Sequence, residues 1–140
     1  MVDAAFSATF IPGVPAVTYD PATVPETGQV RVVVLREGEA TLAVSGLIPD
    51  RFFGAHLNVR ECGPPGAETG PRYQHIVNPD PVFTNPDNEV WLDFITDGDG
   101  LATVNTVHAW PFDTDRPPRS IVIDNGKTAD RLACVNVPWS

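Results

Sequence analysis

The apolar residues of this chain recur with a period of two over most of its length, and this pattern constrains the fold more than any other feature. Segment 40–45 alternates apolar and polar residues, and segment 30–35 is β-branched and mostly apolar. Strict alternation places one face of an extended segment on a core and the other toward solvent. No segment has the pattern of a capped amphipathic helix. The pattern predicts eight short strands, at residues 6–10, 30–35, 40–45, 54–59, 90–95, 101–107, 120–123 and 132–137.

Turn-forming residues separate these segments. The chain has 15 prolines and 11 glycines, mostly between the predicted strands, and residues 36–39 and 97–100 have the composition of hairpin connections. Short strands with frequent turn signals are typical of antiparallel sandwiches and Greek-key barrels. A length of 140 residues suits one domain with its own core. We therefore predict a single all-β domain over residues 1–140, an eight-stranded antiparallel Greek-key barrel or sandwich.

Two polar segments interrupt the strand pattern. Residues 63–88 and 110–119 are rich in proline, glycine and polar side chains. A long segment without strands or helices in a compact domain is usually functional or held down by contacts. We expect the first of these loops to be anchored near its start, at Cys62.

The charge balance excludes some classes of partner. The formal net charge is -9, with 9 Lys+Arg against 18 Asp+Glu. Nucleic-acid binding requires a basic stripe, which this chain lacks, and binding to anionic lipid is disfavoured for the same reason. No apolar run approaches the roughly 20 residues that span a bilayer, so we expect no membrane insertion. Met1 fits a native start or a start placed after a removed export signal.

The two cysteines, Cys62 and Cys134, lie in strand-like segments 72 residues apart (134 minus 62). A bridge closing such a loop would contribute about 4 kcal/mol, whereas two buried free thiols are the alternative. Neither cysteine has a second cysteine or a histidine at ligand spacing, so we expect no metal there. A bridge would indicate an oxidising compartment.

Six short motifs carry a resemblance to a known family. They occur in the order Gly-Ala-His-Leu-Asn, Cys, Gly-Pro-Arg-Tyr-Gln-His, Asp-Gly-Asp-Gly, Arg-Ser-Ile-Val-Ile-Asp and Arg-Leu-Ala-Cys, at residues 54–58, 62, 70–75, 97–100, 119–124 and 131–134. In this order the chain resembles the copper/zinc superoxide dismutase family, and its actinobacterial-type branch most. The resemblance implies an eight-stranded Greek-key barrel and a disulfide between Cys62 and Cys134.

The copper ligands of the family do not carry over. Family members hold copper with four histidines, and the resemblance aligns these positions with His56, Asn58, Arg72 and Asp124. Copper redox cycling favours several imidazoles, and an amide is a poor ligand in their place. We therefore expect no competent copper site. In its place we expect an ion pair between Arg72 and Asp124, with Asn58 hydrogen-bonded nearby.

The other site positions of the family are also incomplete. The resemblance aligns His75 and Asp93 with zinc ligands, and the remaining zinc histidine falls near residues 89–90. Arg131 aligns with the arginine that guides superoxide to copper, and we expect it to join the polar cluster. A lone histidine is weak evidence for metal, so we interpret His56 as a hydrogen-bonded strand residue and His75 as a surface residue.

The sequence shows no motif for another kind of catalytic or metal-binding site. His108 matches no family ligand, and we expect it on the surface. Asp97 and Asp99 lie in a predicted hairpin and lack the terminal Glu of an EF-hand loop. No hydrolase elbow, phosphate loop or His-Glu-x-x-His motif is present.

The resemblance and the missing copper ligands together predict a non-catalytic structural or binding module with no copper or zinc cofactor. By analogy with the family, we expect it to be exported and to lie outside the cell or at a bacterial cell envelope. Its partner would be a protein, either a second copy or a true dismutase. The alternative is a divergent superoxide dismutase, converting superoxide to oxygen and hydrogen peroxide. That enzyme would hold copper or zinc in a rebuilt site that uses His56, His75, Asp93 or Asp124.

Overall fold

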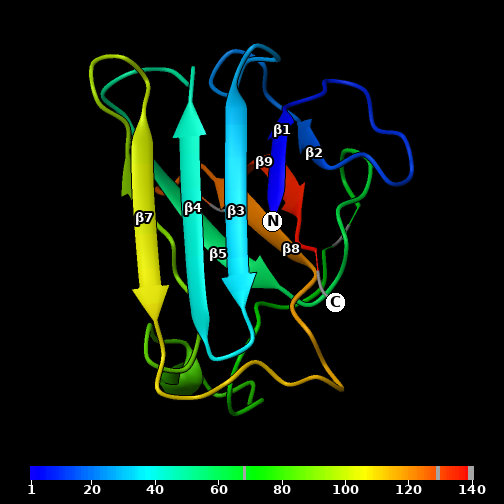
Figure 1. Cartoon of the computed structure of the whole chain (residues 1–140), viewed down its shortest axis with the longest axis vertical. Helices are drawn as coiled ribbons and strands as arrows, with labels where there is room; N and C mark the ends of the chain where they lie inside the picture. Colours follow the sequence, from blue (N-terminus) through cyan, green and yellow to red (C-terminus); the bar gives the residue numbers. More distant parts are fainter. Residues whose placement is uncertain (68, 129, 139–140) are drawn as a thin grey trace.

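Two antiparallel sheets pack face to face in the computed structural model, which describes residues 1–67, 69–128 and 130–138 (Figure 1). The first sheet has the order β1 (Val2–Ala5), β3 (Gln29–Leu35), β4 (Glu39–Ser45), β7 (Ala102–Val107). The second has the order β2 (Ala16–Thr18), β9 (Arg131–Asn136), β8 (Ser120–Asp124), β5 (Phe52–Asn58), β6 (Phe94–Ile95). The prediction of an all-β fold is confirmed, in the form of a β-sandwich.

The sheets do not close into the barrel that we gave as one form of the fold. The connection from β6 to β7 begins as a hairpin, with the Asp97 N–H donating to the Leu101 carbonyl at 2.8 Å. Beyond this point β6 pairs only with β5, through Phe52 and Phe53. The edge of β7 therefore separates from β6, and the sandwich stays open there.

The first sheet follows the sequence pattern closely. Along β4, buried and half-buried residues alternate without a break, and Ala40, Leu42 and Val44 point into the core. The hairpin from β3 to β4 turns at Gly38, which has φ 111°. A Cβ at Gly38 would lie 2.2 Å from the Trp110 carbonyl oxygen, so this turn requires glycine.

The second sheet is covered on both faces. Residues 120–123 of β8 and 132–135 of β9 are all buried. Alternate residues such as Leu57 and Ile121 pack in the core between the sheets. On the other face, Val17 and Val122 form a smaller apolar cluster with the two cysteines. In Figure 1 this sheet crosses behind the first one, with loops on its far side.

Cys62 and Cys134 form a disulfide with an S–S distance of 2.01 Å, which confirms the bridge. The bridge ties the start of loop 63–88 to β9. Further along, the loop is anchored by Tyr73, which is 1% exposed and donates its N–H to the Leu57 carbonyl at 2.8 Å. The loop also contains a short 3-10 helix, η1 (Pro81–Phe83). Within the described ranges, no helix has the length and apolar character needed to cross a membrane.

Two of the strand predictions were wrong. Segment 6–10 is not a strand, because the Ser7 hydroxyl bonds to the Thr9 backbone and turns the chain, while β1 and β2 lie on either side of it. Segment 90–95 is reduced to β6. There the Asp93 carboxylate accepts the Ala55 N–H at 2.8 Å and so occupies a place that a regular ladder would give to a backbone carbonyl.

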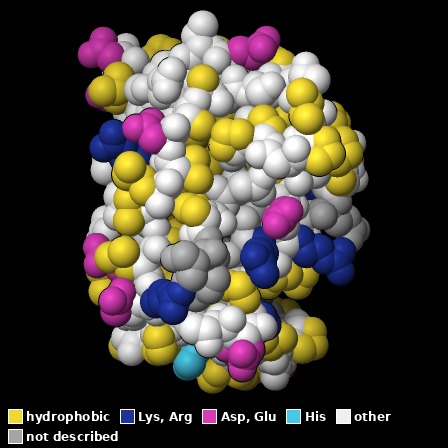
Figure 2. All heavy atoms as spheres, turned by 45° about the vertical axis from the view of Figure 1, so that its right-hand side comes forward, with side chains coloured by type: hydrophobic (Ala, Val, Ile, Leu, Met, Phe, Trp, Pro, Cys, Tyr) yellow, Lys and Arg dark blue, Asp and Glu magenta, His cyan; other side chains and the backbone are white. Residues whose placement is uncertain are grey.

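Charged side chains of both signs occur on the face shown in Figure 2. On the face shown in Figure 2, the basic side chains of the described residues are interspersed with acidic ones and form no continuous stripe.

Candidate functional site

A cavity of about 270 Å³ lies on the outer face of the second sheet. It is lined by His56, Asn58, Gly70, Pro71, Arg72, Val122, Asp124 and Arg131. These residues come from β5, β8, β9 and the long loop. The sequence positions that the resemblance aligned with the copper ligands and the guiding arginine are all among them.

Strand register explains how this cavity is built. β5 and β8 pair with Gly54 opposite Asp124 and His56 opposite Val122. Even-numbered residues of both strands therefore share the outer face, and the odd-numbered ones enter the core. Loop residue Arg72 forms an isolated antiparallel bridge with Asn58, and the Asn58 side chain bonds to Thr69 and Gly70 of the loop. His56 and Asn58 point toward the outer face but are only 8% and 7% exposed.

His56 lies between two carboxylates. Its Nδ1 atom is 3.4 Å from Asp124 Oδ2, and its Nε2 atom is 3.6 Å from Asp93 Oδ1. Both ring nitrogens donate at once only in the imidazolium form. The edge of the ring meets Trp91, with centroids 5.9 Å apart. Because the carboxylates lie at opposite ring nitrogens, a single metal ion does not fit all three side chains in this arrangement.

Asp124 is held as a carboxylate by its surroundings. Burial raises its pKa, but the hydrogen bond from His56, the Gly126 N–H and the positive charge of Arg72 together hold the pKa below its usual 3.8. The Gly126 N–H donates to Oδ1 at 2.8 Å. A Cβ at Gly54 would lie 2.2 Å from the same oxygen, so the carboxylate packs where only glycine leaves room.

Asn58 fastens the loop to the sheet. Its Nδ2 atom donates to the Gly70 carbonyl at 2.9 Å and to Thr69 Oγ1 at 3.3 Å. Its Oδ1 atom is buried and has no hydrogen-bond partner among the described residues. The amide therefore acts as a donor toward the loop, and Asn58 links β5 to the loop at the wall of the cavity.

Arg72 has a different ionic partner from the one predicted. Its guanidinium is 3.6 Å from Glu89 Oε1, so the expected Arg72–Asp124 ion pair was wrong in its partner. Glu89 is almost fully buried and also accepts hydrogen bonds from Gln74 Nε2 and Trp91 Nε1, each at 2.9 Å. Arg72 still lines the cavity with Asp124 and acts on it by charge across that space.

Arg131 lines the same cavity but does not join the ionic network. Its guanidinium donates to the carbonyl of Ala67 in the long loop. Burial raises the pKa of neighbouring Tyr19, and the charge of Arg131 offsets part of that rise. The contact with Ala67 makes Arg131 a second fastening between the loop and β9.

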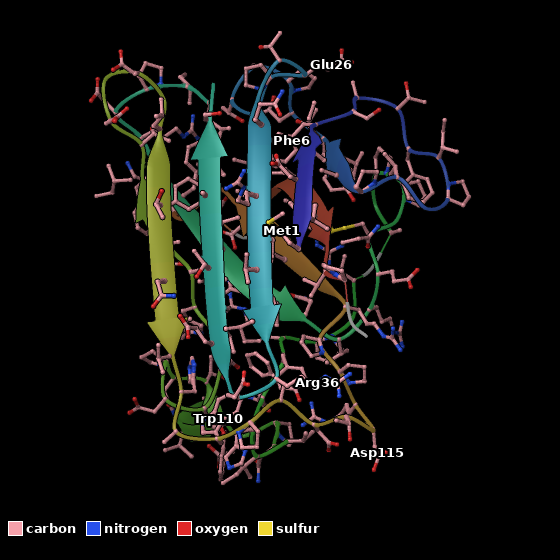
Figure 3. All side chains as sticks on the ribbon, in the orientation of Figure 1. Met1, Phe6, Glu26, Arg36, Trp110 and Asp115 are labelled. Atoms are coloured by element: carbon pink, nitrogen blue, oxygen red, sulfur yellow. A yellow bond between two sulfur atoms is a disulfide. The ribbon has the colours of Figure 1, made fainter. Side chains whose placement is uncertain are left out.

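The two positions aligned with zinc ligands lie apart. Asp93 lies beside His56 and lines an adjoining hollow of about 330 Å³ with Arg72 and Asp124. His75 is exposed, as expected, and stacks on Trp110 with ring centroids 4.8 Å apart. Trp110 lies at the end of the sandwich beneath β4 and β7 (Figure 3).

The surface position expected for His108 was wrong. The residue is buried, with Nε2 2.9 Å from the Glu89 carbonyl oxygen and 3.0 Å from that of Pro86. Its Nδ1 atom is buried without a hydrogen-bond partner among the described residues. His108 therefore fastens the end of β7 to the long loop.

The resemblance aligned the remaining zinc histidine near residues 89–90 but predicted no contact between Glu89 and Arg72, and Trp91 was not assigned to the site. Glu89 and Trp91 lie two positions apart in an extended segment, so alternation alone places them on one face. Their proximity to Arg72 depends on the path of the long loop.

The described residues contain no group of three or more His, Cys, Asp or Glu side chains arranged to hold a metal ion. The side chains at the four aligned copper positions do not fit that metal, since only His56 is an imidazole. No family model matches the chain, and no curated protein is similar to it.

Proposed function

We propose that this protein is a superoxide dismutase-like protein without a competent copper site, acting as a non-catalytic, exported structural or binding module. One observation carries the proposal. The positions that the resemblance aligns with the copper ligands and the guiding arginine line a single cavity, although they are spread over four segments of the chain: His56, Asn58, Arg72, Asp124 and Arg131.

The topology supports the proposed relationship. The chain passes from the first sheet to the second between β1 and β2 and returns between β2 and β3. It passes to the second sheet again between β4 and β5, returns between β6 and β7, and crosses once more between β7 and β8. Crossing connections of this kind are compatible with a Greek-key arrangement. The disulfide also links the start of the long loop to the last strand, which is the pairing that the resemblance implies.

The side-chain contacts support a non-catalytic role. His56 faces a carboxylate at each ring nitrogen, and Asn58 uses its amide to hold the loop. Arg72 adds a fixed positive charge beside the cavity and is paired with Glu89. These groups bind one another and close the loop over the sheet, so the former ligand positions serve the fold.

The disulfide supports the proposed localisation. Disulfides persist mainly in oxidising compartments, so we place the protein outside the cytoplasm, at the cell envelope. Its partner in this proposal is a protein, either a second copy or a true dismutase.

Metal loading tests the proposal. The oxidised protein is incubated with copper and zinc, freed of unbound ions, and measured for metal content and dismutase activity. We expect substoichiometric metal and no activity. Stoichiometric tightly bound copper, with dismutase activity that is lost in His56→Ala, would establish the divergent enzyme instead.

A restored variant provides the positive control. Asn58→His, Arg72→His and Asp124→His together return three imidazoles to the cavity that His56 lines. We expect this triple variant to bind more copper than the natural chain under the same loading. Circular dichroism and the thiol content check that the variant folds and keeps its bridge.

A further inference from the structure

β7 forms an open edge of the first sheet. It pairs with β4 on one side, from Ala102 opposite Val44 to Val107 opposite Glu39. Its other side has no strand partner among the described residues, because β6 pairs with β5. In Figure 1, β7 is the outermost strand of the front layer.

The hydrogen-bonding groups of this edge follow from the register. The His108 N–H donates to the Gly38 carbonyl, so residues 108, 106, 104 and 102 bond toward β4. Thr103, Asn105 and Val107 therefore direct their N–H and C=O groups away from β4. No hydrogen bond to these backbone groups occurs within the parts of the chain that the structure describes. The edge thus presents a row of free donors and acceptors.

This edge lacks the features that usually protect an edge strand. Its residues, Ala-Thr-Val-Asn-Thr-Val, include no charged side chain, no proline and no glycine. Thr103, Asn105 and Val107 are exposed, and Val107 has 69% of its surface accessible. Natural edge strands are commonly blunted with Lys, Pro or a bulge. A six-residue edge without these protective features can pair with another strand.

We propose that a second copy of this chain pairs with β7 in antiparallel orientation, around a two-fold axis at Asn105. Thr103 of each copy then lies opposite Val107 of the other, and the two Asn105 residues lie opposite each other. These are hydrogen-bonded pairs, each exchanging two N–H···O=C bonds. The two first sheets join into one continuous sheet, and the contact is closed because the strand meets its own copy.

The absence of charge on this edge permits a second copy there. The chain carries a net charge of -9, so two copies repel wherever acidic groups meet. The edge strand itself has no charged side chain. The nearest carboxylate on the neighbouring strand belongs to Glu39, whose Oε2 accepts a hydrogen bond from Asn105 Nδ2 at 3.0 Å. Asn105 Nδ2 also donates to Thr41 Oγ1 of β4, so the Asn105 side chain leans toward β4 and the Glu39 carboxylate lies on the β4 side of the edge strand, away from the new seam.

The expected dimer is weak. Pairing one short edge buries less than the roughly 1,200 Å² at which stable complexes begin. Sedimentation velocity should therefore show dimer that grows with concentration up to the millimolar range. A chain that stays monomeric over that whole range overturns the proposal.

Engineered cysteines test the register. The natural cysteines are both in the intramolecular bridge, so an added thiol is the only free one among the described residues. In the proposed dimer the Cα atoms of the two residues 105 are about 5.5 Å apart, within disulfide range. Those of the two residues 103 are about 14 Å apart. Asn105→Cys should form a covalent dimer on mild oxidation, Thr103→Cys alone should not, and a mixture of Thr103→Cys with Val107→Cys should.

A proline variant separates the backbone from the side chain. Asn105→Pro removes an outward N–H without removing a bond to β4, and should lower the dimer fraction at least several-fold. Asn105→Ala is the matched control, because both variants lose the side-chain bonds to Glu39 and Thr41. Asn105→Ala should still dimerise. Equal dimerisation of the proline and alanine variants, or cross-linking that does not depend on position, overturns the proposal. None of these measurements depends on metal content.

Discussion

The first and second sheets differ in what covers their outer faces. In β4 the outer residues are half-buried and open to solvent, and the buried ones alternate with them. In β5, six of seven residues are buried: the odd-numbered ones pack in the core, and on the outer face loop residues contact Asn58. Polar residues on the first sheet therefore interact in water, whereas those on the second, such as His56 and Asn58, lie in a buried network. A polar residue at an outward position is therefore expected to contribute less to the free energy of unfolding in the first sheet than in the second.

The largest expected difference between the layers comes from the disulfide, which belongs to the second sheet. Replacing both cysteines, Cys62→Ala with Cys134→Ala, opens a loop of 72 residues and should lower the free energy of unfolding by about 4 kcal/mol. Urea unfolding measures the loss. Hydrogen exchange should show faster opening in β5 and β8 than in β3 and β4. A uniform change in both sheets would mean that the bridge does not stabilise one layer preferentially.

A smaller effect is expected from the contact between Asp124 and His56 in the second sheet. Asp124→Asn removes the charge that His56 faces and should cost about 1–3 kcal/mol near pH 7. The folded-state pKa of Asp124 lies below its unfolded value, so this stability is present above about pH 4 and is lost as the pH falls through the folded pKa. Unfolding curves at a series of pH values should converge for the two proteins at low pH. A difference that stays constant into strong acid would contradict the assignment.

The smallest effect is expected for the matching ion pair on the first sheet. Arg31 and Asp3 lie 2.9 Å apart on β3 and β1, with side chains 59% and 49% exposed. Solvent screens such pairs, so Arg31→Ala should change the free energy of unfolding by about 0–1 kcal/mol, and less at high salt. Urea unfolding at two salt concentrations checks this. A loss as large as that of Asp124→Asn would remove the proposed contrast between the layers.

Three of the four strands of the first sheet could be predicted from sequence, whereas β1 was not predicted. Segments 30–35, 40–45 and 101–107 each lie within one residue of the observed bounds of β3, β4 and β7 at either end. Their turns also follow from glycine, as at Gly38. Each of these strands has one face exposed to solvent, so apolar and polar residues alternate along it and the strand can be recognised in the sequence.

In the second sheet β5, β8 and β9 lie within two residues of their predicted bounds, whereas β2 and β6 were not predicted correctly. The Asp93 side chain replaces a backbone partner of Ala55, so a segment that alternates like a strand contributes only β6 to the ladder. β2 is three residues long and buried throughout, so it has no alternation to detect. A strand that is both very short and covered on both faces, such as β2, therefore offers no pattern from which it could be predicted.

By itself, the sequence determined the all-β class, the sides of β5 on which His56 and Asn58 point, and the positions that could surround one cavity. Only the tertiary structure decided that these side chains are buried, that Arg72 pairs with Glu89 rather than Asp124, and that His108 lies beneath the long loop. The period of a strand specifies which face a residue occupies. Whether that face is covered depends on a segment that is distant in sequence, such as the long loop. The local sequence of the strand does not indicate where that segment packs.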